Sequence, residues 1–138
     1  MQSKPVDTGR TVRILLADDD PKVCSALRLL LENEPGISIA GECATADELV
    51  EQVARTRADI VLLDWGLPEL RANGAVRQLR ASHPECQVVA LSGRPEDRED
   101  AQRAGVVRFV CKGDPPESLL AVVRELRESR RLCGQRSK

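Results

Sequence analysis

Four short apolar segments of the chain each end at a residue that can take part in polar chemistry. None of them alternates between apolar and polar positions, which is typical of strands buried on both faces of a parallel sheet. In open sheets of this kind, ligands bind outside the carboxyl ends of the strands. The sequence therefore predicts that these side chains gather at one edge of the sheet. They are Asp18, Asp19 and Asp20 after residues 14–17, Asp64 after 60–63, Ser92 after 88–91, and Lys112 after 106–111.

Between these segments apolar residues recur at helical spacing, so five strands are predicted to alternate with five helices. This pattern indicates an α/β fold, a doubly wound five-stranded parallel sheet with helices on both faces. Right-handed crossovers leave few topologies, and the strand order 2-1-3-4-5 places Asp18 and Asp19 beside Asp64. The strands are predicted at residues 12–17, 37–43, 59–63, 87–91 and 106–111, and the helices begin near residues 21, 45, 76, 95 and 115.

The length of the chain, 138 residues, suits one domain. That domain is predicted to span residues 12–128, between a flexible N-terminal arm at 1–11 and a basic C-terminal tail at 129–138. The fourth helix is notably polar and offers only Ala101 and Ala104 as an apolar face. We therefore expect it to be weakly held against the sheet.

Composition narrows the classes of function. Apolar residues make up 41% of the chain, charged residues 31%, and the net charge is −1, so direct binding to nucleic acid or to a membrane surface is not expected. No apolar stretch reaches the length of a bilayer-spanning helix. The five cysteines include no C-x-x-C pair, and residues 1–13 lack the apolar core of a signal peptide, so a cytoplasmic location is expected.

The residues at the strand ends favour chemistry on a phosphoryl group. Adjacent carboxylates repel one another, which favours a bound cation, and an all-oxygen ligand set suits Mg²⁺. The ammonium of Lys112 and the hydroxyl of Ser92 can contact phosphate oxygens, and Asp64 is placed to be the nucleophile that forms an aspartyl phosphate. The sequence carries neither G-x-x-x-x-G-K-[ST] nor G-x-G-x-x-G, so the phosphoryl donor is expected to be a separate molecule.

Together these motifs resemble the receiver domain of two-component response regulators. The resemblance covers about residues 12–128 and implies a flavodoxin-like fold that acts as a phosphorylation-activated switch. The segments LLADDDP and CKGD look closest to the branch that usually carries a helix-turn-helix output domain. The motifs that carry the resemblance are Asp18-Asp19, Asp64 with Pro68 four residues later, Ser92, and Lys112.

The resemblance also implies roles at the site. Asp64 would be the phosphoacceptor and would bind Mg²⁺, with Mn²⁺ as an alternative ion, together with Asp19 and the backbone carbonyl of Gly66. Asp18 would hold the ion through water, and Lys112 would contact the phosphoryl group. The donor would be a sensor histidine kinase or a phosphotransfer protein, as in a phosphorelay.

Ser92 and Phe109 resemble the family's switch hydroxyl and switch aromatic residue. They would couple the site to the face formed by the fourth helix, the fifth strand and the fifth helix. Such a domain assists its own phosphorylation and hydrolysis without being a turnover enzyme. Its partners would include an output partner or an attached DNA-binding domain, and a second copy of the chain stays open as a partner.

Three features depart from the family pattern or need a separate interpretation. The family's usual glycine about eight residues after the acceptor is here Gly74, ten residues on, which predicts a two-residue insertion near Arg71-Ala72. Gly113 follows the lysine where the family commonly has proline, so no cis-proline is available there. The third acid of the cluster, Asp20, is interpreted as the cap of the first helix and not as a metal ligand.

Two other classes of function stay open at this point. The chain could be a pseudo-receiver, an interaction module that is never phosphorylated because the insertion blocks the site. It could also be a small phosphatase that turns over through an aspartyl phosphate, although no second acid follows Asp64 to act as a general acid. Taken singly, Lys112 could be a solvated strand end, Ser92 a helix cap and Phe109 a core residue.

Overall fold

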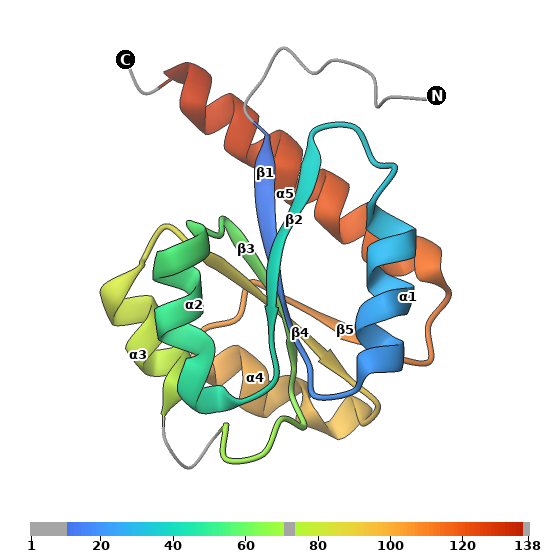
Figure 1. The fold of residues 1–138 in the computed structure, drawn as a ribbon, viewed down its shortest axis with the longest axis vertical. Helices are drawn as coiled ribbons and strands as arrows, with labels where there is room; N and C mark the ends of the chain where they lie inside the picture. The colour runs from blue at the N-terminus through green and yellow to red at the C-terminus, as the bar shows by residue number, and fades with distance from the viewer. Residues whose placement is uncertain (1–10, 71–73, 137–138) are drawn as a thin grey trace.

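A five-stranded parallel sheet forms the centre of the computed structural model, which describes residues 11–70 and 74–136 (Figure 1). The strand order is β2-β1-β3-β4-β5, and all four neighbouring pairs are parallel. This confirms the predicted doubly wound α/β fold and its strand order. The strands are β1 (Val12–Ala17), β2 (Ile37–Cys43), β3 (Ile60–Asp64), β4 (Gln87–Ser92) and β5 (Arg108–Cys111).

Helices cover both faces of the sheet. One face carries α1 (Pro21–Leu31) and α5 (Pro116–Arg136), and the other carries α2 (Leu49–Thr56), α3 (Ala75–Ser82) and α4 (Arg98–Ala104) (Figure 1). Short 3₁₀ turns, η1 (Ala46–Glu48) and η2 (Pro95–Asp97), lead directly into α2 and α4. Each helix therefore connects the carboxyl end of one strand to the amino end of the next, so all five strands end at the same edge of the sheet.

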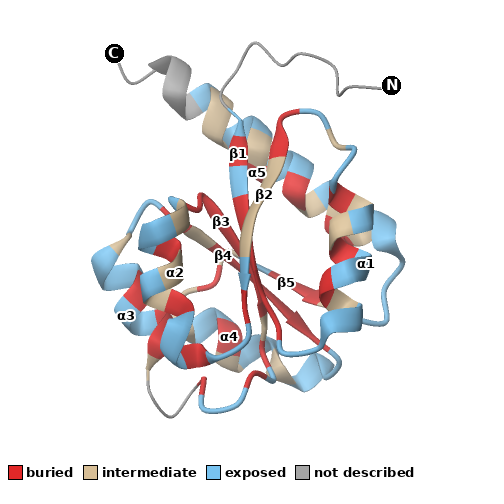
Figure 2. Ribbon diagram, in the orientation of Figure 1, coloured by how far each residue is buried: buried red, intermediate tan, exposed pale blue. Residues whose placement is uncertain are grey.

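Two separate hydrophobic cores explain why the strand sequences lack polar alternation. In β1, Leu15 and Ala17 face the core under α2, α3 and α4, whereas Ile14 and Leu16 face the core under α1 and α5. All four side chains are fully buried, and Figure 2 shows the inner strands buried along most of their length. Because successive side chains of a strand point to opposite faces, apolar residues are needed at every position.

Local signals in the sequence define the helix boundaries. The Asp20 side chain accepts a hydrogen bond from the Lys22 N–H at 2.9 Å, and Pro21 occupies the first turn of α1, which confirms Asp20 as the cap. Gly105 ends α4 at φ 106°, a left-handed conformation that side chains rarely adopt. A Cβ at position 105 would also lie 2.6 Å from Arg80 Cδ, but that exposed side chain can move aside, so it is the positive φ that favours glycine there.

Some predicted boundaries differ from the structure. β3 begins at Ile60 and β5 at Arg108, one and two residues later than predicted. The fifth helix continues to Arg136, through most of the segment that we expected to be a basic tail. Its extension is held by Arg130, whose guanidinium donates hydrogen bonds to Asp59 beside β3.

Some predictions fall on parts of the chain that the structure does not cover. The predicted arm at 1–11, apart from residue 11, and the predicted insertion near Arg71-Ala72 lie outside the described residues. Among the helices that the structure describes, none combines the length and apolar composition needed to cross a bilayer.

Candidate functional site

Three carboxylates meet where β1 and β3 end. β1 pairs with β3 up to Ala17 and Leu63, so Asp18 and Asp19 leave the sheet beside Asp64. One carboxylate oxygen from each of the three lies within 4.8 Å of the others. Asp18 is buried, Asp64 is half-buried and Asp19 is exposed, so the cluster opens to solvent on the side of Asp19.

Asp18 is held in place by the turn that follows it. Its Oδ1 accepts a hydrogen bond from the Asp20 N–H at 2.9 Å, and its carbonyl oxygen accepts one from the Cys24 thiol at 3.6 Å. Burial raises the pKa of Asp18, and the nearby Asp64 carboxylate raises it further, while the hydrogen bond from Asp20 and the charge of Lys112 lower it. The carboxylate therefore depends on a positive partner.

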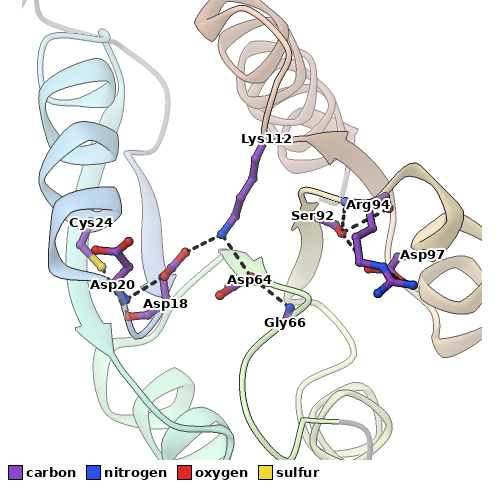
Figure 3. A network of polar contacts seen from close by, with 9 residues as sticks. All are labelled: Asp18, Asp20, Cys24, Asp64, Gly66, Ser92, Arg94, Asp97 and Lys112. Atoms are coloured by element: carbon purple, nitrogen blue, oxygen red, sulfur yellow. Dashed lines mark hydrogen bonds and ion pairs between the residues drawn. The ribbon is translucent and has the colours of Figure 1, made fainter.

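Lys112 supplies that positive charge. Its Nζ lies 3.2 Å from Asp18 Oδ2 and 3.2 Å from Asp64 Oδ1, so one ammonium joins the ends of β1, β3 and β5 (Figure 3). The Lys112 N–H donates to the Ser92 carbonyl at 2.7 Å, which fixes where the side chain starts. Burial alone would lower the pKa of Lys112, but the carboxylates of Asp64 and Asp18 outweigh it and raise that pKa.

The Asp64 carboxylate is oriented by its own turn. Its Oδ1 accepts a hydrogen bond from the Gly66 N–H at 3.0 Å as well as contacting Lys112. The Trp65 N–H donates to the Leu91 carbonyl at 2.8 Å, which extends the alignment of β3 with β4 one residue beyond Asp64. The structure thus places the Gly66 N–H next to Asp64, and the predicted role of Gly66 as a carbonyl ligand stays a prediction.

This donor set fits a hard divalent cation. Among the described residues, Asp18, Asp19 and Asp64 form a group of acidic side chains close enough to share one metal ion. All of its donors are oxygens, the ligands that Mg²⁺ prefers, and Asp19 is accessible to solvent, so bound waters can complete the coordination. The geometry agrees with the predicted magnesium site without assigning a ligand role to any one residue.

Ser92 lies at the end of β4, but its hydroxyl belongs to a second polar network. Ser92 is buried, and its Oγ donates to Asp97 Oδ2 at 2.7 Å and accepts a hydrogen bond from the Arg94 N–H at 2.9 Å. Figure 3 shows these three residues as a group apart from the one around Lys112. The apolar pattern correctly predicted Ser92 at this edge of the sheet, but it gave no sign of the contact with Asp97, one of the charged residues of the notably polar fourth helix.

Two further contacts of α4 were also missed. The guanidinium of Arg98 lies over the Phe109 ring, 4.7 Å from its centroid, and Trp65 Nε1 donates to Asp100 Oδ2 at 3.2 Å. Phe109 and Trp65 are both buried. Ala101 is the fully buried apolar anchor that the sequence predicted, but these polar contacts add to it. The scarcity of aromatic residues was the signal that could have found these contacts, because Trp65 directly follows Asp64 and Phe109 lies three residues before Lys112.

Comparison with known proteins places this geometry in a family. A family model described as "Response regulator receiver domain" matches residues 14–124. The response regulator UvrY of Escherichia coli strain K12 is 25% identical over 122 residues, which cover 87% of this chain and 56% of UvrY. Protein-glutamate methylesterase/protein-glutamine glutaminase 5 of Anaeromyxobacter dehalogenans is 34% identical over 137 residues, which cover 96% of this chain and 36% of that protein.

Solved structures give the same result. A two-component response regulator of the LuxR family from Aurantimonas sp. SI85-9A1 superposes with a TM-score of 0.79 at 29% identity, covering 88% of each chain. The chain spans about half the length of UvrY and about a third of the length of the Anaeromyxobacter protein, the two curated relatives. The chain therefore belongs to the family of response regulator receiver domains, which act in phosphorylation-dependent signalling.

Proposed function

We propose that the chain is a phosphorylation-activated switch in which Asp64 accepts a phosphoryl group from a sensor histidine kinase or a phosphotransfer protein. The observation that carries this proposal is the bridge made by Lys112, whose Nζ lies 3.2 Å from Asp64 and 3.2 Å from Asp18. An ammonium at this distance from the acceptor can neutralise charge on a phosphoryl group bound there. The neighbouring carboxylate of Asp19 provides the third acidic group of the site.

The proposed transfer is a displacement at phosphorus. An oxygen of the Asp64 carboxylate forms a P–O bond while the P–N bond of the phosphohistidine donor breaks, and the electron pair leaves with the histidine nitrogen. The Gly66 N–H and the Lys112 ammonium orient the attacking carboxylate. Lys112 then stays beside the phosphoryl oxygens and offsets part of their negative charge.

The cofactor in this proposal is Mg²⁺, with Mn²⁺ as an alternative. Asp19, Asp64 and the carbonyl of Gly66 would hold the ion directly, and Asp18 would hold it through water. When bound, the ion would supply positive charge that shields the acceptor from the incoming phosphoryl group. Support comes from the all-oxygen donor set and from the accessible side of the cluster at Asp19.

The proposed response to phosphorylation is a change in the face made by α4, β5 and α5. Ser92 and Phe109 would carry it, because both contact the start of α4, through Asp97 and Arg98 respectively. Receiver domains in general are not turnover enzymes, and we propose the same for this chain. Its output would be a partner protein or a DNA-binding domain attached to it, with a homodimer as a further arrangement.

Phosphoryl labelling with a small donor tests the proposal. The parent should gain one phosphoryl mass on incubation with acetyl phosphate and Mg²⁺, and should gain none when a chelator removes the ion. Asp64→Asn should not be labelled, whereas Asp47→Asn, which neutralises an exposed acid elsewhere on the surface, should label like the parent. An unlabelled parent would indicate a pseudo-receiver, and rapid release of phosphate without accumulation would indicate a phosphatase.

A further inference from the structure

The hydroxyl of Ser92 is hydrogen-bonded within the protein. It is 3% exposed, and its Oγ lies 2.7 Å from Asp97 Oδ2, 2.9 Å from the Arg94 amide nitrogen and 3.3 Å from the Arg94 carbonyl oxygen. Asp97 is itself largely buried, with 13% of its side chain exposed. The contact therefore lies inside the protein, where hydrogen bonds are not readily exchanged with water.

The single proton of this hydroxyl decides what Ser92 can bind. A hydroxyl donates one hydrogen bond and accepts two, and the Arg94 N–H already uses one acceptor position. A carboxylate only accepts, so the proton lies between Ser92 and Asp97, at a distance normal for a hydroxyl bonded to an ionised oxygen. Phosphoryl oxygens also only accept. Ser92 cannot donate this proton to Asp97 and to a phosphoryl oxygen at the same time.

We propose that Asp97 is a positioning residue that competes with the phosphoryl group on Asp64 for the hydroxyl proton of Ser92. This inference rests on the proposed function of Asp64 and adds to it a residue that sets the balance of the switch. In the unphosphorylated protein, the Ser92–Asp97 hydrogen bond favours the inactive arrangement. Phosphorylation must break that bond before Ser92 can turn to the acceptor, so the switch responds only to a ligand that replaces it.

The position of Asp97 links this competition to the output face. Asp97 is the last residue of η2 and directly precedes α4. Within α4, the Arg98 guanidinium lies over Phe109, and Asp100 accepts a hydrogen bond from Trp65. When Ser92 releases Asp97, the first turn of α4 loses a buried hydrogen bond. The start of the helix is then free to move together with the side chains that it covers.

Beryllofluoride, a phosphoryl mimic, tests the inference in the presence of Mg²⁺. Removing the competitor with Asp97→Ala should tighten beryllofluoride binding about tenfold, near the lower end of what a hydrogen bond to a charged group contributes. Glu99→Ala is the matched control, because it removes an exposed negative charge two residues further along the chain, in the first turn of α4. That control should leave the dissociation constant unchanged. The emission of Trp65, the only tryptophan, reports the binding.

A double-mutant cycle separates competition for Ser92 from a general effect of charge or folding. In a Ser92→Ala background, Asp97→Ala should no longer tighten binding, because no hydroxyl proton is left to compete for. Asp97→Asn keeps an acceptor oxygen without the charge, so its gain should be smaller than that of Asp97→Ala. Equal gains in both backgrounds, or no gain over Glu99→Ala, would overturn the role of Asp97.

These measurements distinguish failure of the proposed function from failure of the proposed role of Asp97. If the parent binds beryllofluoride and labels at Asp64 but Asp97→Ala behaves like Glu99→Ala, the proposed function stands and the role of Asp97 is rejected. If the parent neither binds beryllofluoride nor labels, the proposed function is rejected and the role of Asp97 with it. Circular dichroism of each variant at the start of the titration checks that the comparison is between folded proteins.

Discussion

Arg130 and Asp59 join the last helix to the edge of the sheet opposite the proposed phosphorylation site. Arg130 Nη2 lies 3.0 Å from Asp59 Oδ1, and Nη1 donates to the carbonyls of Asp59 and Glu85 at 3.3 and 3.0 Å. The other oxygen of Asp59, Oδ2, accepts the Arg13 N–H at 2.9 Å. The Arg130 side chain therefore connects α5 to the segments that precede β3 and β4.

Removing Arg130 should destabilise the protein strongly. Arg130→Ala removes an ion-pair partner from the buried Asp59 carboxylate and a hydrogen-bond donor from two carbonyls, and the expected loss in the free energy of unfolding is about 2 kcal/mol. Arg131→Ala, which breaks only the surface pair between Arg131 and Glu128, should cost less than about 1 kcal/mol. Urea unfolding of both variants measures the difference. Equal losses would show that the Arg130 contacts add no more than a surface ion pair.

Removing one negative charge from the acidic cluster should stabilise the metal-free protein, in contrast to the removal of Arg130. Lys112 contacts Asp18 and Asp64, whereas Asp19 adds a third negative charge within 4.8 Å. Asp19→Asn should therefore raise the melting temperature of the metal-free protein by about 2 °C, as expected for relief of about 0.5 kcal/mol. It should also weaken Mg²⁺ binding. A variant that melts below the parent but binds Mg²⁺ normally would assign Asp19 a structural role.

The fold and the acidic cluster could be predicted from the sequence because the strands are continuous apolar segments. Strand ends are explicit in such a pattern, and the strand order then brings Asp18, Asp19, Asp64 and Lys112 together. The contacts of Asp97 and Arg130 were not readable, because a charged residue in a helix is assumed to be solvated unless its neighbours in space are known. Arg130 meets Asp59 across 71 positions of the chain, and Asp59 was assigned to the third strand itself.

Buried thiols should make the protein sensitive to alkaline pH. Burial raises the pKa of Cys43 to about 11 and that of Cys86 to about 12, from an ordinary value of 9.0. Between pH 9 and pH 11 the unfolded chain releases these protons while the folded protein keeps them. Stability should therefore fall as the pH rises, by about 1.4 kcal/mol per pH unit for each thiol.

The double variant Cys43→Ala/Cys86→Ala tests this prediction through the slope of the free energy of unfolding against pH. The free energy of unfolding should fall less steeply above pH 9 than in the parent, while the two proteins should show parallel profiles between pH 6.5 and pH 8.5. The chain has no tyrosine, so no phenol ionises in the same range. An unchanged slope above pH 9 would show that other groups cause the alkaline loss.

The final prediction concerns where phosphorylation changes the dynamics of the protein. If Ser92 leaves Asp97 for the phosphoryl group, the start of α4 loses a hydrogen bond, and Phe109 beneath Arg98 gains room to turn. Hydrogen exchange with and without beryllofluoride should then differ most across residues 92–112, with the largest change at 95–104. Ser92→Ala should still accept a phosphoryl group at Asp64 but lose much of that difference. A change confined to residues 64–70 would mean that the signal leaves through the turn after the acceptor, and that the hydroxyl and the aromatic side chain are not coupled in this protein.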